Sequence, residues 1–117
     1  MTYYNIEIQM AGERELTDEI LDTVMYILCA KYSATDEVED HRAVIFYRTQ
    51  FLPSEMREKV WKILNTIRDS KTHEPLLHYI DVEYRYEWEM TPDRFVCWSD
   101  GRLVEYKGHV IYTEEEE

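Results

Sequence analysis

Hydrophobic and polar residues alternate over an unusually long stretch of the chain, residues 76–90. Read with a period of two, this pattern predicts a β-strand with one buried and one exposed face. The mostly apolar set is Leu76, His78, Ile80, Val82, Tyr84, Tyr86, Trp88 and Met90. The mostly acidic set is Leu77, Tyr79, Asp81, Glu83, Arg85, Glu87 and Glu89. At about 3.3 Å per residue the strand exceeds the usual length, so we expect it to bend, bulge or project as an arm paired with residues 95–99.

The preceding half of the chain contains patterns for strands and helices in turn. Residues 2–10 alternate as a first strand, and Gly12 marks the turn after it. A helix is predicted from Asp18 to about Tyr32, with Thr17 as its N-cap. The acidic residues 33–40 predict at most a weak edge strand. Residues 42–50 predict a strand with a stronger β pattern. A second helix opens at Pro53, which is tolerated in a first turn.

This order predicts an α+β fold in which two helices cover one face of an antiparallel sheet. The first six elements match the ferredoxin-like βαββαβ arrangement. A C-terminal β-hairpin follows, because residues 95–99 and 103–107 flank the dipeptide Asp100-Gly101. We expect a single domain over residues 1–113 and a solvated acidic tail over residues 114–117.

The chain of 117 residues carries a formal charge of −12, and that charge is unevenly distributed. Residues 42–71 hold seven basic side chains against three acidic ones, whereas the segments on both sides of them are acidic. Such a field repels phosphate backbones and anionic membranes, and it attracts basic proteins. Direct binding to nucleic acid or to a membrane is therefore disfavoured. Aromatic residues make up 14% of the chain, which separates it from acidic disordered sequences.

The sequence contains no pattern typical of an enzyme or of a metal or cofactor site. The histidines are dispersed, and no nucleophile elbow or glycine-rich phosphate loop is present. Only two cysteines occur, Cys29 and Cys97, and both are interpreted as small buried hydrophobic residues, although a disulfide stays open. With no signal peptide and no apolar stretch near 18 residues, a cytoplasmic location is expected.

We therefore predict a small acidic, non-enzymatic protein that binds another protein. The exposed acidic strand face would substitute for nucleic acid on a basic nucleic-acid-binding protein, such as a nuclease or a CRISPR or restriction effector. One strand is too sparse to mimic DNA, because alternate carboxylates lie about 6.6 Å apart against one phosphate per about 3.4 Å. A second acidic row is needed, for example from residues 36–40. The candidate partner-binding residues are Asp81, Glu83, Glu87, Glu89, Asp36, Glu37, Glu39, Asp40, Tyr86 and Trp88.

Three alternatives accompany this hypothesis. The acidic face is also explained as an ordinary solvated surface. The aromatic residues of the long strand equally suit a homodimer or another oligomeric module with that strand as interface. A small ferredoxin-like enzyme or ligand-binding domain is the third. In size, charge and lack of catalytic motifs the chain resembles small acidic bacteriophage and mobile-element proteins that block nucleases, restriction systems or CRISPR effectors, and immunity proteins for nuclease toxins.

Overall fold

The computed structural model describes residues 4–29, 33–39, 41–85, 93–107 and 110–113. In β2, in β7 and at positions 85 and 107 only the backbone is described. The elements are β1 (Tyr4–Gly12), α1 (Asp18–Leu28), β2 (Ser33–Glu39), β3 (Arg42–Thr49), α2 (Pro53–Thr66), β4 (Leu77–Arg85), β5 (Arg94–Trp98), β6 (Leu103–Lys107) and β7 (Val110–Thr113).

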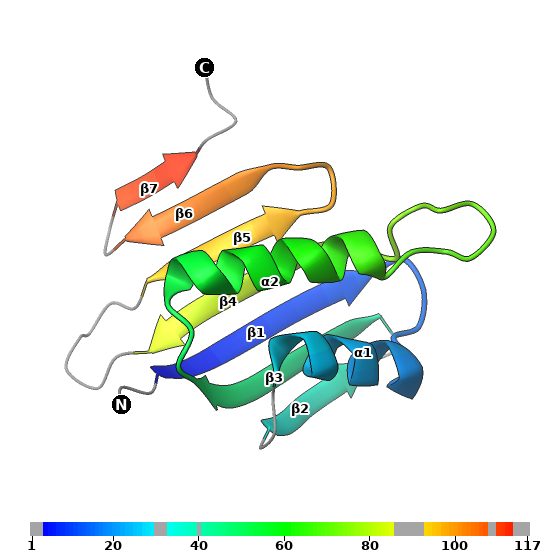
Figure 1. Ribbon diagram of the computed structural model, residues 1–117, viewed down its shortest axis with the longest axis horizontal. Helices are drawn as coiled ribbons and strands as arrows, with labels where there is room; N and C mark the ends of the chain where they lie inside the picture. The colour runs from blue at the N-terminus through cyan, green and yellow to red at the C-terminus, as the bar shows by residue number, and fades with distance from the viewer. Residues whose placement is uncertain (1–3, 30–32, 40, 86–92, 108–109, 114–117) are drawn as a thin grey trace.

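The strands form one seven-stranded sheet in the order β2-β3-β1-β4-β5-β6-β7, and every neighbouring pair is antiparallel. Both helices lie on the same face of the sheet, and within the described residues no helix covers the other face (Figure 1). The predicted α+β class, with an antiparallel sheet and two helices, is confirmed. β4 lies between β1 and β5, so its described part offers no free edge for strand pairing with a second copy.

Helix α1 begins where the sequence predicts and ends earlier than predicted. The Thr17 hydroxyl accepts a hydrogen bond from the Ile20 N–H at 3.3 Å, which satisfies one of the unpaired donors of the first turn. The helix ends at Leu28, because Cys29 adopts the left-handed conformation (φ 56°) that closes many helices. The predicted continuation of the helix is therefore wrong at Cys29, and residues 30–32 lie outside the described residues. Cys29 is also exposed, contrary to prediction, whereas Cys97 is buried, and both are free thiols.

Helix α2 starts at Pro53 as predicted. Proline at the first helical position removes a donor that has no partner there in any case. The Glu55 carboxylate accepts a hydrogen bond from the Leu52 N–H at 3.2 Å, which caps the same end. No described helix is long and apolar enough to cross a membrane.

The hydrophobic core lies between the two helices and the sheet face beneath them. Apolar residues at alternate strand positions meet apolar helix residues at i, i+3, i+4 spacing, which is the packing that both periodicities predict. Fully burying each such side chain is worth about 1.5–3 kcal/mol. The largest fully buried members are Ile8, Met10, Val24, Leu28, Ile45, Met56, Val60, Ile63, Leu77, Ile80, Val82 and Tyr84.

The alternation in β4 breaks near its start, so part of the predicted face assignment is wrong. Ala11 pairs with Tyr79 but Gly12 pairs with Leu77, which leaves His78 as an extra residue in a β-bulge. A one-residue shift exchanges the two faces. Leu77 is therefore buried and His78 exposed, the reverse of the prediction, whereas Ile80, Val82 and Tyr84 face the core as expected. The predicted continuation through residues 86–90 lies outside the described residues.

Gly12 ends β1 instead of forming the predicted turn, and the backbone of Leu76, just before β4, lies close to it. A methyl group added there would lie 2.5 Å from the carbonyl oxygen of Leu76, which is part of the backbone and has little freedom to move away. We expect Gly12→Ala to lower the free energy of unfolding by about 1–3 kcal/mol, the usual cost of overpacking. Urea titration measures this change. A loss below about 0.5 kcal/mol would contradict the close approach of the two backbones.

Candidate partner-binding surface

Three strands bring a compact set of side chains together on the sheet face without helices, called the open face below. The registers place Tyr79 opposite Trp98, and Glu83 opposite Arg94, which in turn is opposite Tyr106. Between these two rows lies a third row of smaller side chains, in which Asp81 is opposite Val96 and Val96 is opposite Val104. Large side chains therefore flank small ones across β4, β5 and β6.

The first flanking row is a stack of flat groups. The rings of Tyr79 and Trp98 have centroids 5.1 Å apart and planes inclined by 50°. The guanidinium of Arg102 lies 4.8 Å from the centroid of the Trp98 ring, where the electron-rich face attracts a cation. Asp100 accepts from Arg102 Nε at 2.8 Å and holds this guanidinium in place. Gly101 allows the turn between them, with φ at 97°.

The second flanking row centres on Arg94. Its guanidinium donates to both carboxylate oxygens of Asp81, at 2.9 and 2.6 Å, and lies 4.8 Å from the centroid of the Tyr106 ring. The hydrogen bonds to Asp81 raise the pKa of Arg94 above its ordinary value. Asp81 is only 9% exposed, whereas the Arg94 side chain is 42% exposed. Arg94 thus covers the carboxylate and presents its own outer edge to solvent.

The space between the two rows is a hollow of about 340 Å³, which we call the cross-strand groove. Val96 and Val104 form its apolar floor, and Asp81 lies at the end nearest β1. This volume falls at the lower end of the range of small-ligand sites, roughly 300–1,000 Å³. The lining residues are Gln9, Tyr79, Asp81, Arg94, Val96, Trp98, Val104 and Tyr106.

The structure corrects the predicted row of exposed carboxylates on this face. Asp81 is buried and paired with the chain's own Arg94, so it is not a bare charge presented to a partner. Glu83 is half-buried and lies directly opposite Glu7 of β1. Arginines at positions 42, 48 and 94 share the open face with these acids, as the strand registers show. The described part of this face therefore carries a mixture of charges.

The other predicted partner-binding residues are placed only in part. Asp36, Glu37 and Glu39 belong to β2, at one edge of the sheet, and only their backbone is described. Asp40, Tyr86, Glu87, Trp88 and Glu89 lie outside the described residues. A role for all of these residues in binding stays a prediction.

Sequence reasoning missed the groove, although one signal for it was present. The prediction assigned Tyr79 to the mostly acidic face of the long strand. Pairing residues 95–99 with residues 103–107 across Asp100-Gly101 places Val96 and Val104 side by side with larger residues on both sides. The missing information was the register between β4 and β5.

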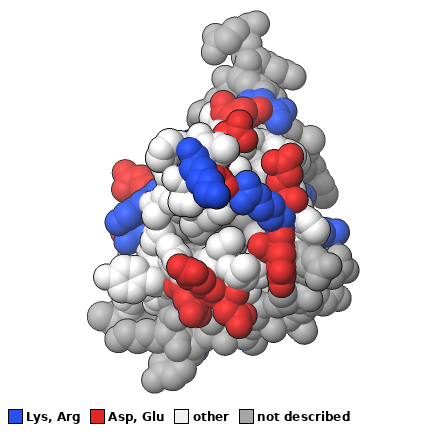
Figure 2. Space-filling model, turned by 90° about the vertical axis from the view of Figure 1, so that its right-hand side faces the viewer, with Lys and Arg blue, Asp and Glu red and all other residues white. Residues whose placement is uncertain are grey.

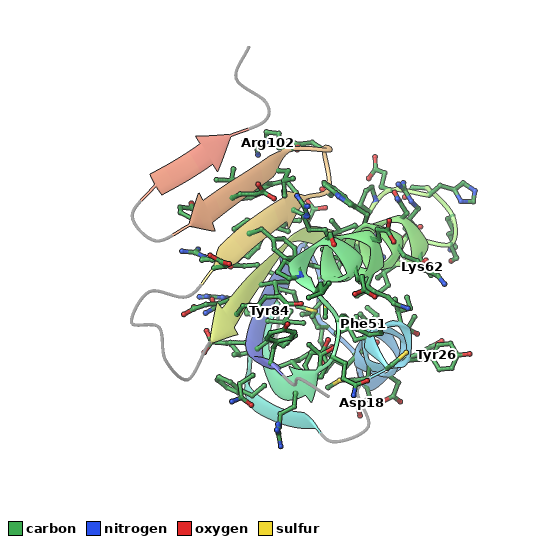
Figure 3. All side chains as sticks on the ribbon, turned by 60° about the vertical axis from the view of Figure 1, so that its left-hand side comes forward. Asp18, Tyr26, Phe51, Lys62, Tyr84 and Arg102 are labelled. Carbon is green, nitrogen blue, oxygen red and sulfur yellow. The ribbon has the colours of Figure 1, made fainter. Side chains whose placement is uncertain are left out.

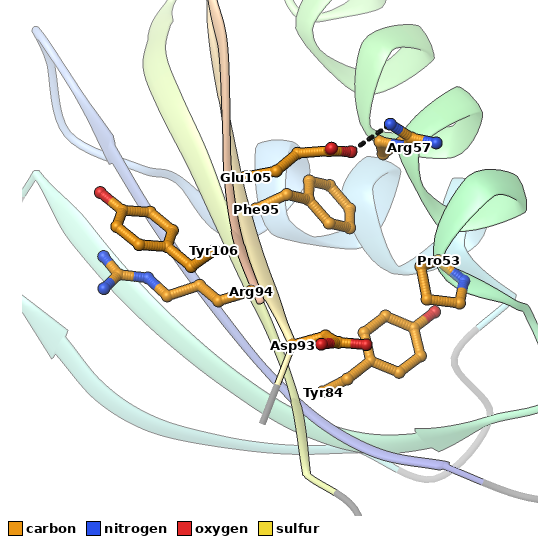
Figure 4. A pocket seen from close by; sticks show the side chains of 8 residues that line it. All are labelled: Pro53, Arg57, Tyr84, Asp93, Arg94, Phe95, Glu105 and Tyr106. Carbon is orange, nitrogen blue, oxygen red and sulfur yellow. Dashed lines mark hydrogen bonds and ion pairs between the residues drawn. The ribbon is translucent and has the colours of Figure 1, made fainter. Parts of the chain in front are cut away.

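A smaller hollow of about 100 Å³ lies beside α2 (Figure 4). Arg57 of α2 forms an ion pair with Glu105 of β6 at one side of it. At another side the Tyr84 hydroxyl donates to the carbonyl oxygen of Phe51 at 2.6 Å, and Figure 3 shows these two residues beside each other. These contacts tie α2 to the sheet, so we interpret this hollow as structural.

A third hollow, of about 460 Å³, lies where the start of α1 meets the loop after α2. Acidic and basic side chains are interspersed on this side of the molecule (Figure 2), so it presents no uniform charge. Asp69 organises the loop by accepting hydrogen bonds from the N–H groups of Thr72 and Lys71, at 2.9 and 2.8 Å, and by pairing with Arg14 at 2.6 Å. The same contacts lower the pKa of Asp69 to about 2.

Asp69 predicts a loss of stability in acid. The pKa of Asp69 is lowered in the folded chain. Its carboxylate therefore contributes fully to the free energy of unfolding above the ordinary pKa of 3.8, and this contribution is lost as the pH falls through about 2. We expect the free energy of unfolding to fall more steeply between about pH 4 and pH 2 in the wild type than in Asp69→Asn. Urea titrations at several pH values measure this slope, with the exposed Asp22→Asn as control. Parallel slopes for wild type and Asp69→Asn would contradict the assignment.

The described residues contain no group of three or more histidine, cysteine, aspartate or glutamate side chains arranged to hold a metal ion. Comparison of the chain with protein-family models, with curated proteins and with solved structures found no match. A function for this chain therefore has to be inferred from its own geometry and charge.

Proposed function

We propose that this protein is a small, acidic, non-enzymatic binding protein that docks its open sheet face on a basic surface of a protein that handles nucleic acid. Docking there would block access of nucleic acid to that surface. The partner would be a protein such as a nuclease or a restriction or CRISPR effector. We also infer the ferredoxin-like βαββαβ architecture. The order β2-β3-β1-β4 supports it, and β5 to β7 then extend the sheet beyond β4.

The observation that carries the proposal is the cross-strand groove. Tyrosine, tryptophan and arginine are the residue types that contribute most to binding energy at protein interfaces. Here Tyr79, Trp98, Tyr106 and Arg94 line one hollow on the face that neither α1 nor α2 covers. By contrast, Tyr26 of α1 is 84% exposed and stands alone, pointing away from the helix (Figure 3). A single exposed aromatic residue is common on protein surfaces, whereas a cluster around a hollow is not.

The charge distribution supports a basic partner. The described side chains include fifteen acidic and ten basic residues, so the remaining side chains, ten acidic against three basic, hold more than half of the net charge of −12. Most of these acids lie in residues 36–40 and 114–117. Charge of one sign accelerates association with a partner of opposite sign and opposes the approach of nucleic acid itself. We therefore propose a protein partner over direct nucleic-acid binding.

Affinity capture followed by competition tests the proposal. Immobilised protein is expected to retain a basic nucleic-acid-binding protein from cell extract, and retention is expected to fall as salt rises. The purified partner is then mixed with its DNA or RNA, and added protein should displace the nucleic acid in a mobility-shift assay. Retention without displacement would contradict occupation of the nucleic-acid surface. Retention of no basic protein at low salt would contradict the proposal as a whole.

A further inference from the structure

We propose that the partner adds one extended, basic segment to the sheet as a new strand along the outer edge of β7. This inference rests on the proposed function, because it names a contact by which a basic partner binds the same protein. It goes further by assigning that contact to main-chain hydrogen bonds at one edge of the sheet.

The two edges of the described sheet differ in their protection against strand pairing. A strand at an edge leaves a row of N–H and C=O groups without a strand partner, and proteins guard such edges with charge, proline or bulges. β2 carries three acidic residues, Asp36, Glu37 and Glu39, and its register with β3 shifts between positions 36 and 39. The edge at β2 is therefore a poor site for an added strand.

The edge at β7 has none of these protections. Its residues, Val110–Thr113, are Val, Ile, Tyr and Thr, which are types favoured in strands, and none of them is charged or proline. All four pair with β6 in one uninterrupted register. Figure 1 shows β7 at the end of the sheet, beyond both helices, and no described strand pairs with its outer side. An extended segment can therefore pair along this edge.

β7 also continues the open face. The registers place Ile111 beside Tyr106 and Thr113 beside Val104, on the face that carries the cross-strand groove. A strand added to β7 would place every second side chain on this same face, next to Ile111 and Thr113. A partner docked on the open face and its segment paired with β7 would thus make one continuous contact.

Charge complementarity favours a basic segment. Four glutamates, residues 114–117, follow Thr113 directly in the sequence, whereas β7 itself is uncharged. All neighbouring strands of this sheet are antiparallel, and in that orientation the residues that precede the paired part of the segment approach the Thr113 end of β7. Lysine or arginine is favoured there. A second copy of the chain would instead bring a charge of −12 against the same charge.

Defined peptides test the inference on the intact chain. The probe is acetyl-Arg-Lys-Arg-Thr-Val-Ile-Val-amide, compared with its reversed sequence, which has the same composition and charge. Amide hydrogen exchange reports the contact, because an added strand protects only every second N–H of β7. We expect the probe to slow exchange at least tenfold at alternate residues of 110–113, and at none of residues 33–39. It should bind at least fivefold more tightly than the reversed peptide. No binding, protection at β2, or equal binding of the two peptides would overturn the inference.

N-methylation of the probe separates main-chain pairing from contacts made by side chains alone. One version carries methyl groups on the nitrogens of Thr and Ile, and the other on the nitrogens of the two Val residues. In an extended strand these two sets of N–H groups point to opposite sides, so only one set faces β7. We expect one version to bind at least tenfold more weakly than the other. Equal affinities of the two versions would contradict strand addition.

Neutralising residues 114–117 tests the charge of the segment. We expect glutamine at all four positions to weaken binding of the probe at least fivefold at low salt. The matched control neutralises four exposed acids elsewhere, Glu13, Glu15, Asp22 and Glu58, and should leave binding nearly unchanged. Equal weakening in both variants would contradict the placement of the basic residues at the end of β7.

The captured partner separates this inference from the proposed function. If the partner binds without slowing exchange in β7, the inference fails while the proposed function stands. If the probe adds to β7 but no basic partner is retained by the chain, the proposed function fails and the site remains. Slowed exchange in β7 of the chain alone, rising with its concentration, would show that a second copy occupies the edge and would also overturn the inference.

Discussion

Replacing Arg94 with leucine is expected to lower the free energy of unfolding by about 2–3 kcal/mol. The reason is that Asp81, only 9% exposed, would lose both hydrogen bonds from the guanidinium and keep a buried charge without that compensation. Removing one partner of a fully buried ion pair costs about 3–5 kcal/mol. We expect somewhat less here because Arg94 itself is 42% exposed and water reaches the pair. Urea titration of the variant measures the loss.

Replacing the other partner of this ion pair, Asp81, is expected to lower the free energy of unfolding by less. In Asp81→Leu the remaining group is the half-exposed Arg94, which stays hydrated and stacked on Tyr106, so we expect a loss of about 1 kcal/mol. The free energy of unfolding of the double variant, Asp81→Leu with Arg94→Leu, should lie nearer the wild-type value than that of Arg94→Leu alone. The reason is that no buried charge is left without its ion-pair partner. A larger loss for Asp81→Leu than for Arg94→Leu would contradict the account of which partner is buried.

Neutralising residues 36, 37, 39 and 40 is expected to slow association with the captured partner by about tenfold or more at low ionic strength. Electrostatic attraction raises association rates by about 10- to 1,000-fold, and this segment contains four acidic residues in the sequence, three of which belong to β2 at one edge of the sheet. The difference from the wild type should shrink as salt rises, because screening shortens the range of the field. Stopped-flow or surface-based kinetics across a salt series measure both effects.

A control with the same change in net charge locates the effect. Glu13, Glu15, Asp22 and Glu58 are exposed, and none of them caps a helix. Their neutralisation also removes four negative charges and should slow association only slightly. An equal loss of rate in both variants would show that overall charge, and not its placement at the β2 edge, guides the encounter.

Local signals in the sequence predicted much of the fold. Thr17 before an apolar stripe, Pro53 before another, and Asp100-Gly101 between two short strands each act through neighbouring residues. Such signals operate within a few residues, where backbone geometry and hydrogen bonding are set by the local chain. The starts of both helices and the C-terminal hairpin were therefore predictable.

The candidate site was not predictable in the same way. Asp81 and Arg94 are thirteen residues apart, and they meet only because β4 and β5 pair in one particular register. Period-two reading placed Asp81 correctly on the face opposite the core, but it could not show that an arginine from the next strand covers it. The same reading failed at His78, because a β-bulge shifts the alternation by one residue and leaves no clear mark in the sequence.

The most direct test of the open face as the docking surface is backbone amide chemical-shift mapping of this protein with its captured partner. We expect the largest shifts and line broadening on β4, β5 and β6 around the cross-strand groove. Little change is expected in α1 and α2, which lie on the other face of the sheet. Perturbations centred on the two helices, with the groove residues unchanged, would contradict docking through the open face.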